Sequence, residues 1–502
     1  MRDRRSPEST VSADRSSTPA DLPAGYDGRR RWQALGVGLV AAFMTLLDVS
    51  IVNVAVPSID RALHATPSDL QWVLSGYALT FGLVLVPAGR FGDARGRRIG
   101  FVVGVTLFTV TSALAGLARS PEWLVIARLV QGAAAGIVNP QVSGVIQQLF
   151  RGAERGRAFG LLGATIGIST AVGPLLGGLL IQLGGEEHGW RWVFFVNIPV
   201  GIVAVLLGWR LLPGRPTGQP DRHRLDPVGV LLLGIGVTLV LLPLVQREQW
   251  QTPWKWILIP IGLAFLAAFA AWERWYARHR PPLFDLRLFA LQSYTLGSLI
   301  GLVYFAGFTA IFFIYTLYLQ VGLGYSALAA GLAITPFALG SAAASAVGGR
   351  VVTRLGRPLV ATGLLVVVAG LLATFWVLRG EPHQSVGLRT ALPLLLAGLG
   401  SGLVIAPNQT LALSEVPVPQ AGSGAGMLQT GQRIGSAAGI AGVGALFFST
   451  LADTRGDWAT AFRHALLLAA GIIALALVAA ILDIAGGRRA GRAAAGPSAA
   501  GS

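Results

Sequence analysis

The sequence contains no cysteine, and only 12% of its residues are charged. The missing thiols exclude disulfides, thiolate nucleophiles and cysteine-ligated metals. A soluble domain usually carries about twice this share of charged residues, whereas hydrophobic residues make up 53% of this chain. The composition therefore predicts a protein that lies in a lipid bilayer.

Lysine is also nearly absent. Lys255 stands in the sequence WKW and not in a phosphate-binding GxxxxGK[ST] motif, so ATP hydrolysis is not expected. The histidines lie in predicted loops or helix ends, and we expect no metal site from them: His64, His188, His223, His279, His383 and His464. Neither a catalytic cluster nor a soluble domain is evident, so an enzyme is not expected, and the only energy source predicted is a proton gradient.

The net charge of +16 is compatible with nucleic-acid binding, but the basic residues fall in short connections and in the two tails. A nucleic-acid interface would need a basic stripe on a folded domain, so no nucleic-acid partner is expected. Abundant arginine, alanine and glycine beside scarce lysine indicate GC-rich coding, which is common among bacteria.

Long apolar runs dominate the rest of the chain. With windows of about 20 apolar residues, they predict an all-α integral membrane protein with fourteen spans. The spans are placed near 33–56, 70–89, 99–118, 122–147, 158–183, 191–211, 227–246, 255–273, 292–319, 326–349, 358–378, 390–413, 424–449 and 463–485.

Arginines gather in the connections that follow even-numbered spans, for example Arg95, Arg97 and Arg98. By the positive-inside rule these connections and both termini face the cytoplasm, and the protein is placed in the bacterial inner membrane. The connection after the twelfth span is an exception, since it contains Glu415 and no arginine.

A basic turn occurs twice, as GRFGDARGRR from Gly89 and as GRVVTRLGR from Gly349. These turns follow the second and tenth spans, which predicts two six-helix bundles with two inserted helices. The predicted domains are a disordered cytoplasmic tail at 1–31, an N-terminal bundle at 32–212, a linker with two helices at 213–285, a C-terminal bundle at 286–486 and a second disordered tail at 487–502.

Several motifs appear in a characteristic order. They are LDVSIVNVAVP in the first span, GRFGDARGRR after the second, ARLVQGAAAG in the fourth, GISTAVGPLLGG in the fifth and WRWVFFVNIPVG before the sixth. Together they resemble the fourteen-span drug:proton antiporters of the major facilitator superfamily, the EmrB/QacA type. The resemblance implies alternating access, and the motif of the fifth span implies export.

Asp48 and Arg128 are the ionisable residues placed most clearly within the membrane. Each costs about 2.5–3.5 kcal/mol to insert if unpaired, and counting residues from the span ends puts them at similar depth. We interpret them as a proton-coupling pair, and a static ion pair is the alternative. Arg433 in the thirteenth span lies nearer the inner end, where a structural role is favoured.

The gate is predicted at two places. By resemblance, the loop with Gly89, Asp93, Gly96 and Arg97 locks the two halves on the cytoplasmic side, while its second copy has Thr353 in place of the aspartate. In the fifth span the predicted gating residues are Gly173, Pro174 and Gly177, because small residues permit close helix packing and proline permits a bend.

Aromatic and amide side chains are the candidates for a substrate cavity: Asn53, Gln131, Asn139, Tyr304, Phe308, Phe312, Tyr315, Asn408 and Gln409. Aromatic rings can stack on flat or cationic compounds. The sequence therefore predicts proton-coupled efflux of hydrophobic or amphiphilic organic compounds, such as antibiotics. Proton-coupled uptake of a small organic solute is the alternative, and a membrane-embedded sensor or enzyme is less favoured.

Overall fold

The computed structural model describes residues 28–214, 226–245, 250, 252–280, 282–379 and 385–494. These ranges contain helices and no strand. The long helices are α1 (Gly28–Leu63), α2 (Pro67–Arg95), α3 (Arg97–Gly116), α4 (Pro121–Leu149), α5 (Gly152–Phe195), α6 (Asn197–Leu211), α7 (Pro227–Val245), α8 (Leu258–Tyr276), α9 (Gln292–Leu317), α10 (Ala327–Leu355), α11 (Arg357–Val377), α12 (Val386–Ala412), α13 (Ala421–Asp453) and α14 (Trp458–Ala494). Short helical turns are η1 (Pro253–Ile257), η2 (Leu286–Ala290), η3 (Tyr318–Gly322) and η4 (Val418–Gln420).

Fourteen helices in the described ranges are long and apolar enough to cross a membrane, which confirms the predicted number of spans. One predicted boundary shifts because α5 runs on to Phe195 with a break at Gly185, whose φ is 77°. That left-handed backbone suits glycine, and it divides the fifth and sixth spans into Gly152–Gly185 and Glu187–Leu211. Of the tail predicted at 1–31, residues 1–27 lie outside the described residues, and residues 28–31 form the first turn of α1. At the other end α14 continues to Ala494, past the predicted end of the bundle at 486.

Glycine forms both repeated turns. Gly96 joins α2 to α3 with a φ of 98°, and Gly356 joins α10 to α11 with a φ of 57°. Non-glycine residues rarely adopt these angles, so the two copies of the motif share a local cause for the same reversal of the chain. At the far end of α2, Thr66 and Asp69 form a capping box that fixes where the helix begins.

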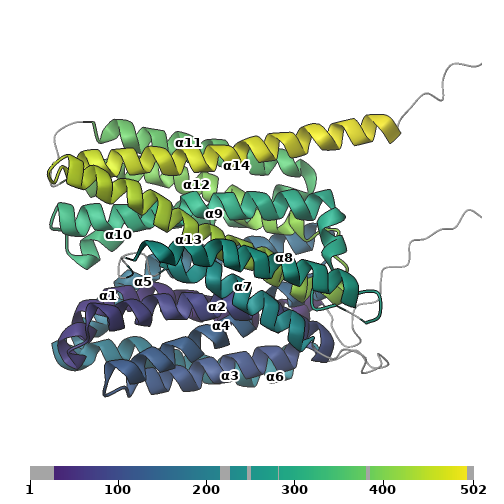
Figure 1. Cartoon of the computed structure of the whole chain (residues 1–502), viewed down its shortest axis with the longest axis horizontal. Helices are drawn as coiled ribbons and strands as arrows, with labels where there is room; N and C mark the ends of the chain where they lie inside the picture. Colours follow the sequence, from purple (N-terminus) through teal and green to yellow (C-terminus); the bar gives the residue numbers. More distant parts are fainter. Residues whose placement is uncertain are drawn as a thin grey trace, which may run out of the picture.

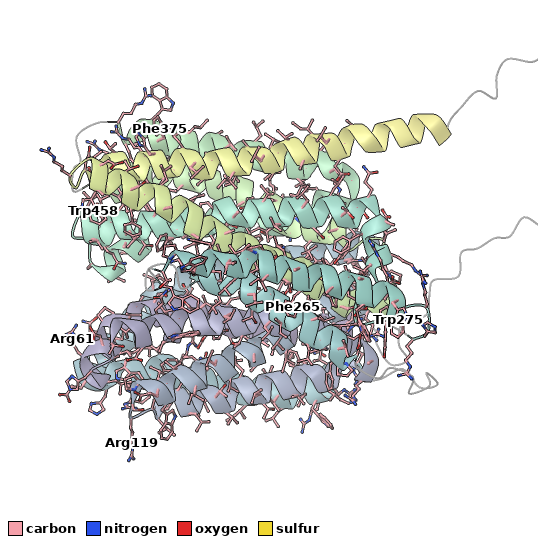
Figure 2. The ribbon with its side chains drawn as sticks, viewed as in Figure 1. Arg61, Arg119, Phe265, Trp275, Phe375 and Trp458 are labelled. Atoms are coloured by element: carbon pink, nitrogen blue, oxygen red, sulfur yellow. The ribbon has the colours of Figure 1, made fainter. Side chains whose placement is uncertain are left out.

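The helices lie side by side in two groups, with α1 to α6 in one and α9 to α14 in the other (Figure 1). Helix α1 begins and α14 ends at the same end of the molecule, which we call the terminal end (Figure 1). In Figure 2, Trp275 lies toward this end, whereas Arg61, Arg119 and Trp458 lie at the opposite end. The two groups meet mainly where α5 packs on α10 and α2 on α13, and the inserted helix α7 packs on both α2 and α13.

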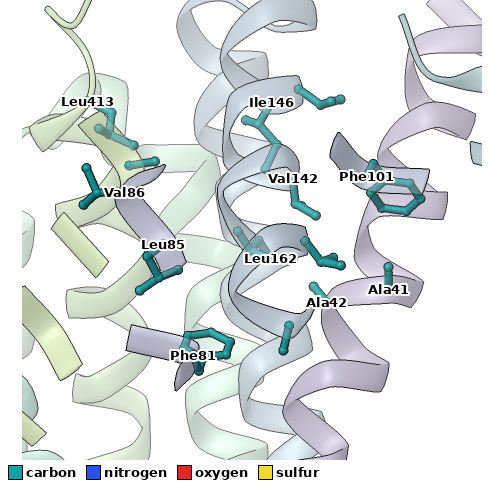
Figure 3. Packing of buried hydrophobic residues seen from close by; sticks show 14 of the residues in the cluster. Ala41, Ala42, Phe81, Leu85, Val86, Phe101, Val142, Ile146, Leu162 and Leu413 are labelled. Carbon is teal, nitrogen blue, oxygen red and sulfur yellow. The ribbon is translucent and has the colours of Figure 1, made fainter. Parts of the chain in front are cut away.

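A hydrophobic core joins the two bundles near the terminal end. It contains Phe81, Leu85 and Val86 of α2 together with Leu413 and Ala425 of the C-terminal bundle. Figure 3 shows the α2 residues along their helix, with Leu413 next to Val86. The buried cluster around Ile51 and Trp190, by contrast, consists of N-terminal residues alone. In this conformation the bundles are therefore held together at the terminal end.

Candidate functional site

A buried ion pair lies inside the N-terminal bundle. Arg128 of α4 donates from Nη1 to Oδ2 of Asp48 on α1, and the two side chains are 1% and 0% exposed. Arg128 also donates from Nε to the carbonyl oxygen of Val73, at 3.0 Å. The structure thus joins the two residues that the sequence placed at equal depth, and each charge compensates the other.

Two amide side chains complete the surroundings of the Asp48 carboxylate. Gln131 donates from Nε2 to Asp48 Oδ1 at 3.0 Å and accepts from Arg128 Nη1 at 2.8 Å. Asn197, at the start of α6, donates to the same carboxylate oxygen at 3.2 Å and to Ser112 Oγ at 3.0 Å. Asn197 was not among the predicted site residues, although it lies in the WRWVFFVNIPVG motif that pointed to the sixth helix.

Aromatic rings extend this network toward the other bundle. The Arg128 guanidinium carbon lies 4.2 Å from the ring centroid of Tyr77, and Tyr77 stacks on Phe81 with 6.2 Å between centroids. On the other side, the guanidinium carbon of Arg433 from α13 lies 4.2 Å from the centroid of Phe81. No pattern in the sequence indicates this link, because its members come from helices far apart in the chain.

The repeated turn after α2 binds the opposite bundle. Asp93 accepts the backbone N–H groups of Gly422 and Ser423, at 3.0 and 2.9 Å, in the first turn of α13. Arg97 donates to Asp93 Oδ1 at 3.1 Å and to the carbonyl oxygen of Val418 at 2.8 Å. A carboxylate at a helix N-terminus is stabilised by the unpaired amides and the helix dipole, so this contact holds the terminal end closed.

Glycines bring the two bundles into backbone contact at this end. A Cβ added to Gly89 would lie 2.3 Å from the carbonyl oxygen of Gly422, and one added to Gly156 would lie 2.4 Å from that of Gly349. The second copy of the turn uses other partners, since Arg357 pairs with Asp483 through Nε at 2.7 Å. Only the first copy places a carboxylate on the partner bundle, in agreement with Thr353 in the second.

The glycines and proline of α5 face two different helices. Cβ atoms added to Gly173 and Gly177 would meet Ser50 and Ile51 of α1 at 2.4 and 2.9 Å, whereas Pro174 lies against Gly331 of α10. In this part of α5 the glycines contact the helix's own bundle and the proline contacts the other bundle, whereas Gly156 and Gly160, near the start of α5, also meet α10. This arrangement suits a helix on which one bundle rocks against the other.

Four of the predicted cavity residues use their polar groups inside one bundle. Tyr304 donates to Ser401 Oγ at 2.7 Å, and the hydroxyls of Tyr315 and Thr390 lie 2.6 Å apart. Asn408 donates to the carbonyl oxygen of Gly297 and accepts from Arg357, while Gln131 belongs to the ion pair described above. These polar groups therefore have hydrogen-bond partners in this conformation, and their place in a substrate cavity stays a prediction.

The other predicted cavity residues remain candidates. Phe308 and Phe312 are half-buried and pack edge-to-face, with 5.0 Å between centroids, and Asn53 is exposed. Asn139 donates to Thr45 Oγ1 at 3.3 Å, and Gln409 donates to Ser143 of the opposite bundle, also at 3.3 Å. Their place in a substrate cavity also stays a prediction.

The inserted helices hold two buried carboxylates that the sequence reasoning missed. Asp226 and Glu273 are 2% and 1% exposed. Oδ2 of Asp226 and Oε1 of Glu273 each lie 2.6 Å from the point where a Cβ on Gly229 would sit. Trp272 donates to Asp226 at 2.6 Å, whereas Glu273 Oε1 has no hydrogen-bond partner. Across the described ranges, no three potential ligands are grouped so that they could hold a metal ion.

Several curated proteins resemble this chain over most of its length. The probable actinorhodin transporter of Streptomyces coelicolor is 36% identical over 89% of this chain and 78% of its own length. The puromycin resistance protein of Streptomyces alboniger is 37% identical over 85% and 84%, and the tetracenomycin C resistance and export protein of Streptomyces glaucescens is 32% identical over 90% and 83%.

Solved structures share the fold at low sequence identity. The human organic anion transporter MFSD10 superposes with a TM-score of 0.64 at 16% identity, over 90% of this chain and 99% of that one. The proton:xylose symporter XylE gives 0.63 at 14% identity, over 90% and 95%. The family model of the Major Facilitator Superfamily matches residues 38–440. With this match and the all-helical fold of fourteen candidate spans, the chain belongs to the major facilitator superfamily.

Proposed function

We propose that this chain exports hydrophobic or amphiphilic organic compounds, antibiotics among them, in exchange for protons. Relatives at 32–37% identity are named as puromycin resistance, tetracenomycin C resistance and export, and cephamycin export proteins. These names support the outward direction of transport and the class of substrate. The observation that carries the proton exchange is the buried Asp48–Arg128 pair. An ionisable pair deep in a membrane bundle is typical of proton relays in transporters.

Protonation of Asp48 would change the charges and hydrogen bonds that join helices of the N-terminal bundle. The ionised carboxylate accepts from Arg128, Gln131 and Asn197, and these three bonds tie α1 to α4 and α6. A proton on Asp48 removes its charge and leaves Arg128 without a counter-ion. Because the two protonation states favour different helix arrangements, proton binding and release can bias alternating access.

The orientation of the cycle follows from the positive-inside rule. With the arginine-rich terminal end in the cytoplasm of a bacterial cell, both termini are cytoplasmic and the Asp93–α13 contact is a cytoplasmic gate. The conformation described above is then closed on the cytoplasmic side. Substrate taken from the cytoplasm or the inner leaflet requires the opposite state, in which the bonds from Asp93 to Gly422 and Ser423 are broken.

The experiment compares Asp48→Asn with Asp60→Asn. Both are on α1, but Asp48 is buried and Asp60 is exposed. In a host without its own efflux pumps, we expect the wild type and Asp60→Asn to lower dye accumulation until an uncoupler is added. Asp48→Asn should be inserted normally and lose this uncoupler-sensitive efflux. Full activity of Asp48→Asn would refute the coupling role, and net accumulation of dye by the wild type would indicate uptake.

A further inference from the structure

The Arg433 side chain lies between the two bundles. It is twelve residues into α13 from Ala421, which corresponds to roughly 18 Å along the helix and to the middle of a bilayer core about 30 Å thick. One turn before it, Gln429 reaches Ser143 of α4 in the opposite bundle, at 3.3 Å. Arg433 itself lies over Phe81 of α2. This face of α13 therefore points toward the N-terminal bundle.

Arg433 differs from the other arginines inside the bundles because it has no counter-ion. Arg128 pairs with Asp48, Arg97 with Asp93 and Arg357 with Asp483. For Arg433, no hydrogen bond or ion pair is formed with any residue that the structure describes, and its contact is the ring of Phe81. The attraction between an aromatic ring and a desolvated guanidinium is weaker than the cost of an unpaired arginine at mid-membrane.

The guanidinium is also reachable. Arg433 is half-buried, and its nitrogens are not among the buried polar atoms that lack a partner. One turn further along α13, the Ser436 and Thr309 hydroxyl oxygens lie 2.8 Å apart, so α9 packs against this part of α13. A planar cation without a counter-ion among the described residues thus lies beside the Phe81 ring, where α13 meets α2.

We propose that Arg433 binds the carboxylate or phenolate of an aromatic substrate, so that the compounds exported include organic anions. The planar guanidinium can donate two parallel hydrogen bonds to such a group. The planar guanidinium can also stack on an aromatic ring of the substrate. This inference rests on the proposed export function and names the substrate class that the site selects.

The test uses two probes of the same shape and different charge, anthraquinone-2-carboxylate and anthraquinone-2-carboxamide. Equilibrium dialysis against the purified full-length protein in lipid nanodiscs gives both affinities without a proton gradient. We expect the wild type to bind the carboxylate at least tenfold more tightly than the carboxamide. Arg433→Gln should lose this preference by weakening carboxylate binding alone, whereas Arg354→Gln, an exposed arginine of α10, should keep it.

Equal affinity of the wild type for the two probes would overturn the proposal, and so would an unchanged preference in Arg433→Gln. If Arg433→Gln does not fold, Arg433→Lys serves in its place and should keep part of the preference, because it retains the charge without the planar fork. Failure of the export proposal can be distinguished from failure of the anion site, since Asp48→Asn should still bind the carboxylate in nanodiscs. Loss of preference in Arg433→Gln together with proton-independent transport would reject the coupling and retain the anion site.

Discussion

Arg128 and Arg433 lie at the two ends of one stacked aromatic pair. Each guanidinium carbon is 4.2 Å from a ring centroid, of Tyr77 for Arg128 and of Phe81 for Arg433. Since Tyr77 and Phe81 belong to α2 and Arg433 to α13, the contact between Phe81 and Arg433 spans the two bundles. The ion pair of Asp48 is thus physically connected to the interface that must open during transport.

Replacing the ring of Phe81 should weaken the closed state. Phe81→Leu removes a contact of about 0.5–2 kcal/mol, whereas Phe81→Tyr retains the ring. Because the chain has no cysteine, single reporter cysteines at the terminal end can be labelled without background. We expect faster labelling in Phe81→Leu and near wild-type labelling in Phe81→Tyr. Identical rates in both variants would show that the ring contributes nothing to closure.

Asp93→Asn should slow transport with little loss of substrate affinity. The amide retains one acceptor oxygen, but its NH2 group faces a backbone N–H and no longer attracts Arg97. Losing charge-assisted bonds of this kind costs about 1–3 kcal/mol in the closed state. Turnover and half-saturating substrate concentration measured in proteoliposomes separate the two effects. Asp453→Asn, at the exposed far end of α13, is the control, and a large affinity change in Asp93→Asn would place that residue in the binding site.

Pro174→Ala should impair export more than folding. Proline inside a helix removes one backbone hydrogen bond and costs about 3 kcal/mol or more, so alanine should straighten α5 and leave its thermal stability unchanged or raised. A straight α5 is expected to hold the protein in one conformation. The ratio of labelling between reporter cysteines at the two ends measures this, with Pro57→Ala near the end of α1 as the control. Normal efflux and an unchanged ratio would leave the proline as a packing residue.

Glu273→Gln should stabilise the inserted helices. Oε1 of Glu273 has no hydrogen-bond partner and lies on the same side of Gly229 as Oδ2 of Asp226. An amide nitrogen in that place can donate to Asp226, which is worth about 1 kcal/mol, and it removes one buried charge. Thermal unfolding of the purified protein measures the change. Glu273→Ala, which leaves a cavity, should unfold at a lower temperature. Oε2 accepts from the Phe284 N–H at 3.4 Å, so a loss of stability in Glu273→Gln would mean that Oε1 also has a partner.

The sequence by itself determined the number of spans, the repeated glycine turns and the common depth of Asp48 and Arg128. These are local properties, because an apolar run of fixed length measures the bilayer and a constant rise per residue measures depth. The sequence also identified Asp93. The second copy of the turn has Thr353 at the matching position, and this difference distinguished the two copies.

Only the tertiary structure decided which partners these residues have. The amides of Gln131 and Asn197 complete the Asp48 site, Asn408 binds Gly297 and Arg357, and Tyr304 binds Ser401. Arg433 lies beside Phe81 and has no counter-ion in the part of the chain that the structure describes. Such outcomes depend on how each helix is rotated and tilted against neighbours distant in the chain. A helix that is apolar all round has no distinct hydrophobic face, so its sequence does not show which side packs against which neighbour. For that reason the sequence could name the chemical groups inside the membrane, while their pairing followed from the packing of the helices.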